Sequence, residues 1–312
     1  MRSAWTWTLI AASCLVSKAS AELPAPGSTY HILFATSGLL RTTTSTLLPP
    51  AALRFNGIAG ADWQASNAAF SAGLPDAHAW TDATPIYRAI LSMSGDNARD
   101  RLSVTAPVIN MHGTLLATSH TELFDGNLAA PVGYDEYGNL ITSNFDVWSG
   151  STPSGTAGGQ SCGSWDVVSS GVTGRIGDAV ESSTSWLGAG PTKACNLAAR
   201  LYALSPALTA PLWGDYDGSG TVDGGDVLQW QRYVGLGPGT GTQLPSAFIA
   251  ARSFLDGNQV AVVGAADLEV IQQFFGQSLP ATTEIPEPST TLLTLIAAVA
   301  TRRLAFRRKG NQ

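Results

Sequence analysis

The sequence predicts two folded parts: an α+β domain over residues 22–205 and a small α-helical module over residues 214–277. In the first part, HILFAT (31–36) and APVINMHGTLLAT (106–118) have the apolar composition of buried strands. The stretch ADWQASNAAFSAGL (61–74) instead places its apolar residues at helical spacing. In the second part, a loop rich in Asp and Gly leads into an apolar run, which predicts a loop followed by a helix.

Residues 1–21 have the layout of a secretory signal peptide. An apolar run from Trp5 to Val16 follows one arginine, and the small residues Ala19-Ser20-Ala21 come at the spacing of a cleavage site. The alternative is a buried N-terminal helix. The signal peptide is favoured, because the run is too short to span a bilayer and the small residues follow it at the right distance. We expect cleavage after Ala21 and export of the chain.

The exported part is strongly acidic. All 23 acidic residues, but only ten of the 17 basic residues, lie between residues 22 and 289. A surface of this charge repels phosphate backbones and acidic lipids. Nucleic acid is therefore excluded as a partner.

The C-terminal residues follow a second ordered pattern. Residues 278–289 form a tether that ends in the motif Pro286-Glu287-Pro288-Ser289, and residues 290–312 contain an apolar segment and then a basic end. This order resembles the PEP-CTERM sorting signal of bacteria that make exopolysaccharide. The resemblance implies an exosortase-type processing enzyme as a partner and at least transient contact with the membrane, the basic end staying cytoplasmic.

The apolar segment of this tail is only about half of the roughly 20 residues that a spanning helix needs. A helix lying at the membrane interface is therefore the alternative. In either case, the resemblance implies that the protein lies at the outer membrane, the cell surface or the extracellular matrix of a Gram-negative-type bacterium.

The first domain contains a series of short strings in a fixed order. They are GIAGADWQASNAAFSAGL, YRAILS, PVINMHGTLL, ELFDG, VWSGSTPSG, CGSW and ACNLAARLYALS, running from residue 57 to residue 205. In this order they resemble the endostatin domain of animal collagens. The resemblance implies a C-type-lectin-like fold and a binding or display role for residues 22–205.

This region contains two cysteines, Cys162 and Cys195. In an exported chain, such a pair is most simply one disulfide. The resemblance supports this pairing, since the two match the inner disulfide of the family, while Ala65 and Ala203 occupy the positions of the outer one. A loop of roughly 32 residues closed in this way is worth about 3 to 4 kcal/mol. The family's zinc site is not carried over, because Gly113 stands where an aspartate is expected.

Two patterns in the first domain are compatible with catalysis, and we interpret both as structural. Residues 159–163 match G-x-S-x-G, but no strand pattern precedes the serine, as a nucleophile elbow requires. The pairs Asp96/Asp100 and Asp135/Glu136 lie in polar loops, where we expect solvated charges rather than a glycosidase pair. We therefore expect a protein that is not an enzyme.

Residues 206–213 form a proline-bearing linker, and the aspartate-rich loop DYDGSGTVDGGD follows it. Its residues at positions 1, 3, 5, 7, 9 and 12 match the ligand positions of a Ca²⁺-binding EF-hand loop, with Gly220 at position 6 allowing the sharp turn. Without an ion, so many neighbouring carboxylates repel one another. The predicted calcium ligands are Asp215, Asp217, Ser219, Thr221, Asp223 and Asp226.

Aspartate at position 12, followed directly by a helix, resembles a type I dockerin, a paired EF-hand module in which the loop and helix occur twice. The second copy places Asp256, Asn258 and Asp267 at positions 1, 3 and 12. Val260 and Gly264 replace the ligands at positions 5 and 9, so we expect weak or no calcium binding there. The resemblance implies docking to a cohesin-like module.

Together, these patterns predict an exported, non-catalytic envelope protein with calcium as its cofactor. An extracellular polysaccharide is a further candidate partner. The alternative is a carbohydrate-active hydrolase, which needs two carboxylates about 5 to 9.5 Å apart in a cleft. A second alternative is a polysaccharide-binding subunit, which needs exposed aromatic side chains such as Trp80, Trp148 or Trp186 on a flat face.

Overall fold

The computed structural model describes residues 23–43, 54–77, 85–188, 190–236 and 262–279. The described helices and strands all belong to the first of two compact units, Met1–Ser278 and Leu279–Gln312. Within the described ranges, no helix is both long enough and apolar enough to cross a membrane.

Several predicted features lie outside the described residues. They are the signal peptide, the C-terminal sorting helix, the motif Pro286-Glu287-Pro288-Ser289, and Asp256 and Asn258 of the second loop. Trp80 lies outside them as well.

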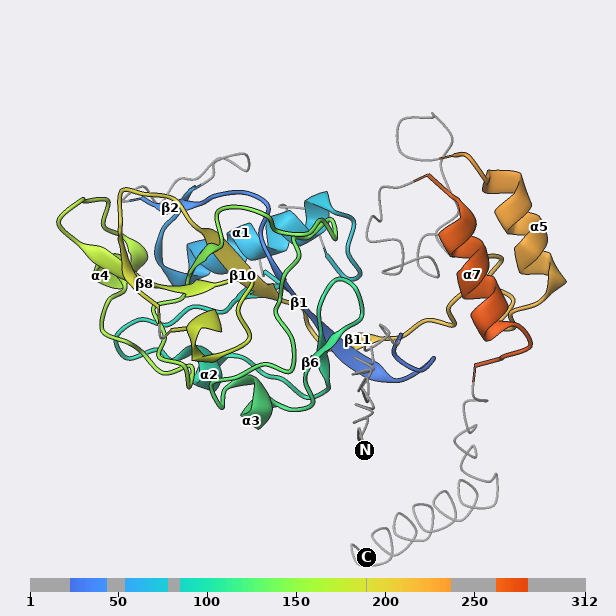
Figure 1. The fold of residues 1–312 in the computed structure, drawn as a ribbon, viewed down its shortest axis with the longest axis horizontal. Coiled ribbons are helices and arrows are strands. Elements are labelled where there is room, and N and C mark those ends of the chain that lie inside the picture. The colour runs from blue at the N-terminus through green and yellow to red at the C-terminus, as the bar shows by residue number, and fades with distance from the viewer. Residues whose placement is uncertain (1–22, 44–53, 78–84, 189, 237–261, 280–312) are drawn as a thin grey trace, which may run out of the picture. The chain divides into compact units, whose positions relative to one another are not determined.

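The first domain is built on a nine-stranded mixed sheet (Figure 1), which together with its helices confirms the α+β fold class. The two central strands pair antiparallel, and each has a parallel neighbour on its other side. In spatial order the strands are β6 (Leu115–Ala117), β5 (Val108–Ile109), β1 (Thr29–Ala35), β10 (Arg200–Leu204), β7 (Asp146–Trp148), β8 (Thr173–Asp178) and β9 (Thr192–Ala194).

Four short strands complete the described sheets. Strand β4 (Arg88–Ala89) pairs with β10, and β11 (Leu208–Thr209) pairs with β1. Strands β2 (Arg41–Thr42) and β3 (Arg54–Phe55) form a separate parallel pair. Strand β11 lies within residues 206–213, which were expected to be a linker. Its pairing with β1 therefore makes this part of the linker a member of the first domain's sheet.

The central strands are covered on both faces, so their apolar residues run without polar interruption. Ile32 and Phe34 of β1 belong to one buried cluster, while Leu33 and Ala35 belong to another. Successive side chains of a strand point to opposite faces, and the two clusters are therefore the cores on the two sides of the sheet.

Helix α1 (Gly57–Ser71) covers one of these cores and packs against β4 and β10. Its buried residues include the small Ala61, Ala65 and Ala69, which allow a close approach to the sheet. The remaining short helices of the described first domain are α2 (Ala98–Arg101), α3 (His120–Leu123), α4 (Cys162–Trp165) and the 3-10 helix η1 (Thr184–Trp186).

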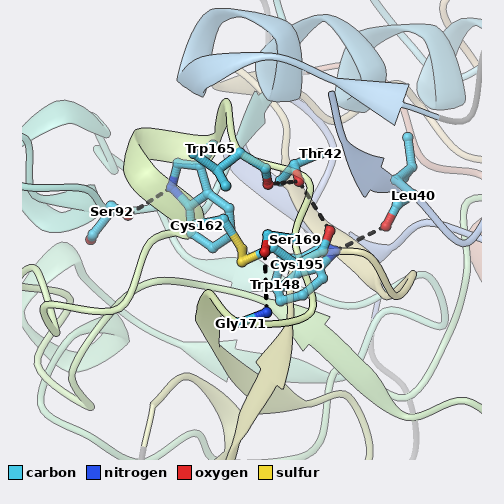
Figure 2. Close-up of a disulfide and its surroundings, with 10 residues drawn as sticks. Leu40, Thr42, Ser92, Trp148, Cys162, Trp165, Ser169, Gly171 and Cys195 are labelled. Atoms are coloured by element: carbon cyan, nitrogen blue, oxygen red, sulfur yellow. Dashed lines mark hydrogen bonds between the residues drawn. A yellow bond between two sulfur atoms is a disulfide. The ribbon is translucent and has the colours of Figure 1, made fainter. Parts of the chain in front are cut away.

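Cys162 and Cys195 form a disulfide in the first domain, the pair expected from the sequence, with their Cα atoms 5.6 Å apart. Figure 2 shows it among Trp148 and Trp165, whose indole N–H groups donate to the Leu40 and Ser92 carbonyls at 2.9 Å each. Both sulfur-bearing residues are fully buried. The cross-link is therefore part of the core.

The element α4 is a left-handed turn rather than an ordinary helix. All four of its residues, Cys162 to Trp165, have positive φ angles between 48° and 70°. Only glycine adopts this conformation without cost, and three of the four residues are not glycine. The buried disulfide on one side and the buried Trp165 on the other hold the turn in place.

The second module consists of two described helices that pack side by side, α5 (Gly224–Tyr233) and α7 (Ala265–Phe274) (Figure 1). Val270, Ile271 and Phe274 bury one face of α7. Leu228 of α5 is 67% exposed and Phe275, just after α7, is 58% exposed, so these two do not belong to the shared face.

Candidate metal centre

Three of the predicted calcium ligands lie together at the start of α5. Asp215, Asp217 and Asp226 each offer a carboxylate oxygen, and these oxygens lie within 4.8 Å of one another. They stand at positions 1, 3 and 12 of the loop, so residues far apart along the loop converge on one point. A Ca²⁺ ion takes six to eight oxygen ligands at 2.3–2.6 Å, and three converging carboxylates supply the charged part of such a set.

The loop backbone fixes Asp215, which is buried. Its two carboxylate oxygens accept the N–H groups of Ser219 and Gly220, each at 2.9 Å. Gly220 has a φ of +85°, a conformation that a residue with a side chain adopts only at a cost. The glycine at position 6 therefore makes the turn that brings these N–H groups to Asp215.

Asp226 is the most deeply buried of the three carboxylates, with no exposed surface. One oxygen accepts the N–H groups of Tyr216 at 2.6 Å and Asp217 at 3.1 Å, and the other accepts that of Asp223 at 2.8 Å. The last bond belongs to the capping box at the start of α5. Burial, with a contribution from nearby Asp217, raises the pKa of Asp226 above the ordinary aspartate value.

The other three predicted ligands make hydrogen bonds of their own, and the carboxylate of Asp223 is not part of the cluster. The Ser219 hydroxyl donates a hydrogen bond to the Thr221 carbonyl at 3.0 Å, so the groups expected to bind the ion at positions 5 and 7 are hydrogen-bonded to each other. Asp223 caps α5, accepting the Gly225 N–H at 2.6 Å. A Cβ atom at Gly225 would lie 2.6 Å from a carboxylate oxygen of Asp217, so a larger residue here would require the Asp217 side chain to move.

The charge balance of the loop is the feature that points to a cation. Among the described residues, no lysine, arginine or histidine forms a salt bridge with Asp215, Asp217 or Asp226. The hydrogen bonds that they accept come from backbone N–H groups, which carry no net charge. Clustered anions without a counter-charge favour the uptake of a cation.

The second loop is described only at its end. Asp267 is buried, and one of its oxygens accepts the Gly264 N–H at 2.7 Å. This repeats the bond between Asp226 and the Asp223 N–H, so the helix start is the same in both copies. Gly264 has no side chain to offer an ion at the position that Asp223 occupies in the first loop.

The interpretation of Asp135 and Glu136 as solvated charges is wrong. Asp135 is 8% exposed and Glu136 only 3%. Asp135 accepts the N–H groups of Tyr137 and Asn139, and Glu136 accepts the N–H and the hydroxyl of Ser37. Burial raises the pKa of Glu136, although the bonds from Ser37 oppose this. Through these hydrogen bonds, both carboxylates stabilise loops of the first domain.

The aromatic residues considered for a flat binding face are also buried. Trp148 and Trp186 have no exposed surface, and both belong to the cores of the first domain. His31 is buried as well, with one ring nitrogen 2.9 Å from the Ser205 carbonyl and the other accepting the Thr105 N–H at 3.1 Å. Neither tryptophan can stack on a polysaccharide.

Sequence patterns missed one charged site. Asp62 of α1 is 2% exposed and bonds to Arg88, to Arg101 and to the Ala89 N–H. Both guanidinium groups lie 3.0 Å from the carboxylate. Its only sequence signal is an acid within the apolar pattern of a helix, and the arginines that pair with it come from distant segments.

No protein-family model matches the chain, and the comparison with curated proteins gives no match either.

Proposed function

We propose that this chain is an exported, non-catalytic envelope protein whose C-terminal module binds one Ca²⁺ ion and serves as a docking module. The observation that carries the proposal is the convergence of Asp215, Asp217 and Asp226, within 4.8 Å, at the ligand positions of an EF-hand loop. The sequence match to a dockerin supplies the docking role. The partner is then a cohesin-like module or an extracellular polysaccharide.

Ser219, the Thr221 carbonyl and Asp223 complete the ligand set in this proposal, at positions 5, 7 and 9 of the loop. Asp226 is both the last ligand of the loop and a buried residue in the first turn of α5. Ion binding at Asp226 is therefore connected to the position of the helix.

The first domain is, in this proposal, a lectin-like unit for binding or display. Its support is the ordered series of sequence strings together with the observed α+β architecture and the buried disulfide. The sorting tail delivers the domain to the cell surface.

Calorimetric titration of the full-length mature chain with Ca²⁺ tests the proposal. We expect saturable uptake of one ion per chain, lost in Asp215→Asn because the substitution removes the charged ligand at position 1. The control is Asp166→Asn, which changes an exposed aspartate of the first domain and leaves uptake intact. An absence of heat and of uptake in the unmodified chain would overturn the calcium assignment.

A further inference from the structure

The first loop contacts α7 at both of the helix's ends. Near the start, the Tyr216 hydroxyl donates to the Asp267 carbonyl at 3.0 Å. Just beyond the end, Val222 exchanges two backbone bonds, donating to the Gln277 carbonyl at 2.9 Å and accepting the Gly276 N–H at 2.8 Å. A single loop thus holds a helix that belongs to the other half of the module.

Both contacting residues are placed by the candidate calcium ligands. The Tyr216 N–H donates to Asp226 at 2.6 Å, and Tyr216 itself is 1% exposed. Val222 is fully buried between Thr221 and Asp223, the residues at positions 7 and 9. Any force that fixes these ligands therefore also fixes the two residues that touch α7.

The reverse arrangement is present in the second half, with one difference. Val263 accepts the Gly235 N–H at 2.9 Å and donates to the Leu236 carbonyl at 2.8 Å, so it pairs with the chain after α5 as Val222 pairs with the chain after α7. In addition, the Trp230 indole donates to the Gly264 carbonyl at 2.7 Å. The end of the second loop is thus held by a side chain of α5.

We infer that one Ca²⁺ ion at the first loop orders both helices, because Tyr216 and Val222 transmit the fixed loop geometry to the two ends of α7. This inference rests on the proposed calcium binding and adds its consequence. The second loop and α7 need no ion of their own. The indole bond of Trp230 and the backbone bonds of Val222 and Val263 connect them to the first loop and α5. By reciprocity, weakening these contacts lowers the calcium affinity.

The test compares two Tyr→Phe variants of the full-length mature chain by calcium calorimetry. Tyr216→Phe keeps the buried ring and removes only the hydroxyl bond to Asp267, so we expect calcium affinity to fall about 3- to 5-fold with one ion still bound. Tyr202→Phe is the matched control, because its hydroxyl also donates to a main-chain carbonyl, that of Trp186, but within the first domain. We expect no change in its calcium affinity.

Amide hydrogen exchange of α7 supplies the second measurement. We expect calcium to slow exchange in both α5 and α7 of the unmodified chain, and to slow it less in α7 when Trp230→Phe removes the indole bond to Gly264. Unchanged affinity in Tyr216→Phe, or calcium protection confined to α5, would overturn the inference while leaving the calcium site intact. If the unmodified chain takes up no calcium, the proposed function fails with it.

Discussion

The two folded parts of the chain balance the charge of their acidic residues in different ways. In the first domain, Asp62 is paired with Arg88 and Arg101, so the protein supplies the counter-charge itself. In the second module, Asp215, Asp217 and Asp226 converge, and among the described residues they accept hydrogen bonds from backbone N–H groups. The first site is complete as folded, whereas we propose that a Ca²⁺ ion completes the second.

The two parts also differ in what holds the ends of a loop together. The first domain closes its loop at Cys162 and Cys195 with a covalent bond inside the core. The module has no cysteine, and its loop is closed by hydrogen bonds to carboxylates. We therefore expect the first domain to keep its stability when divalent cations are removed, and the module to lose part of its own.

The largest expected effect is that of removing the disulfide. Replacing both cysteines by alanine opens a loop with a sequence separation of 33 residues, which lowers the free energy of unfolding of the first domain by about 3 to 4 kcal/mol. Denaturant unfolding measures this loss. Calcium affinity should be unchanged, and a loss of calcium binding in this variant would break the separation between the two parts.

The Asp62→Asn substitution tests the internally balanced acid. It leaves the guanidinium of Arg101, whose side chain is only 13% exposed, without its carboxylate, so we expect a destabilisation of about 3 kcal/mol. The measurement is denaturant unfolding with and without Ca²⁺. Recovery of the lost stability on adding calcium would contradict the claim that this site is complete without a solute.

The smallest effect concerns the left-handed turn next to the disulfide. Ser164 is exposed and has a φ of 68°, so Ser164→Gly removes the steric cost and stabilises the first domain by about 0.5 to 1 kcal/mol. Gly163→Ala, at the neighbouring position, should destabilise the first domain instead, because the added Cβ would lie 2.4 Å from a methyl carbon of Val167. Thermal unfolding of both variants provides the measurement. Destabilisation by Ser164→Gly would show that the turn is not strained.

Local sequence patterns predicted the parts of this molecule whose determinants are close together in the chain. The candidate calcium ligands fall within one loop, and the residue spacing with Gly220 at position 6 predicted the convergence of Asp215, Asp217 and Asp226. The start of α5 is likewise set by Asp223 and Asp226, which lie within one helical turn of each other.

Apart from the disulfide, the features that depend on distant residues were not predicted. Burial of Glu136 follows from its contact with Ser37, which lies two residues after the end of β1, and a polar loop sequence contains no sign of that contact. The pairing of Asp62 with two arginines depends in the same way on how α1 packs against β4. The left-handed turn at Cys162 requires the tertiary positions of the disulfide and Trp165.

The central claim is that only the second module is completed by a solute, and hydrogen exchange of the full-length mature chain tests it in both parts at once. With Ca²⁺ at 100 times its dissociation constant, we predict that amides of α5 which exchange through unfolding of the module slow by about 100-fold. Amides of β1 and β10 should not change. Equal exchange in α5 with calcium and with a chelator, or slowing throughout the first domain, would contradict the account.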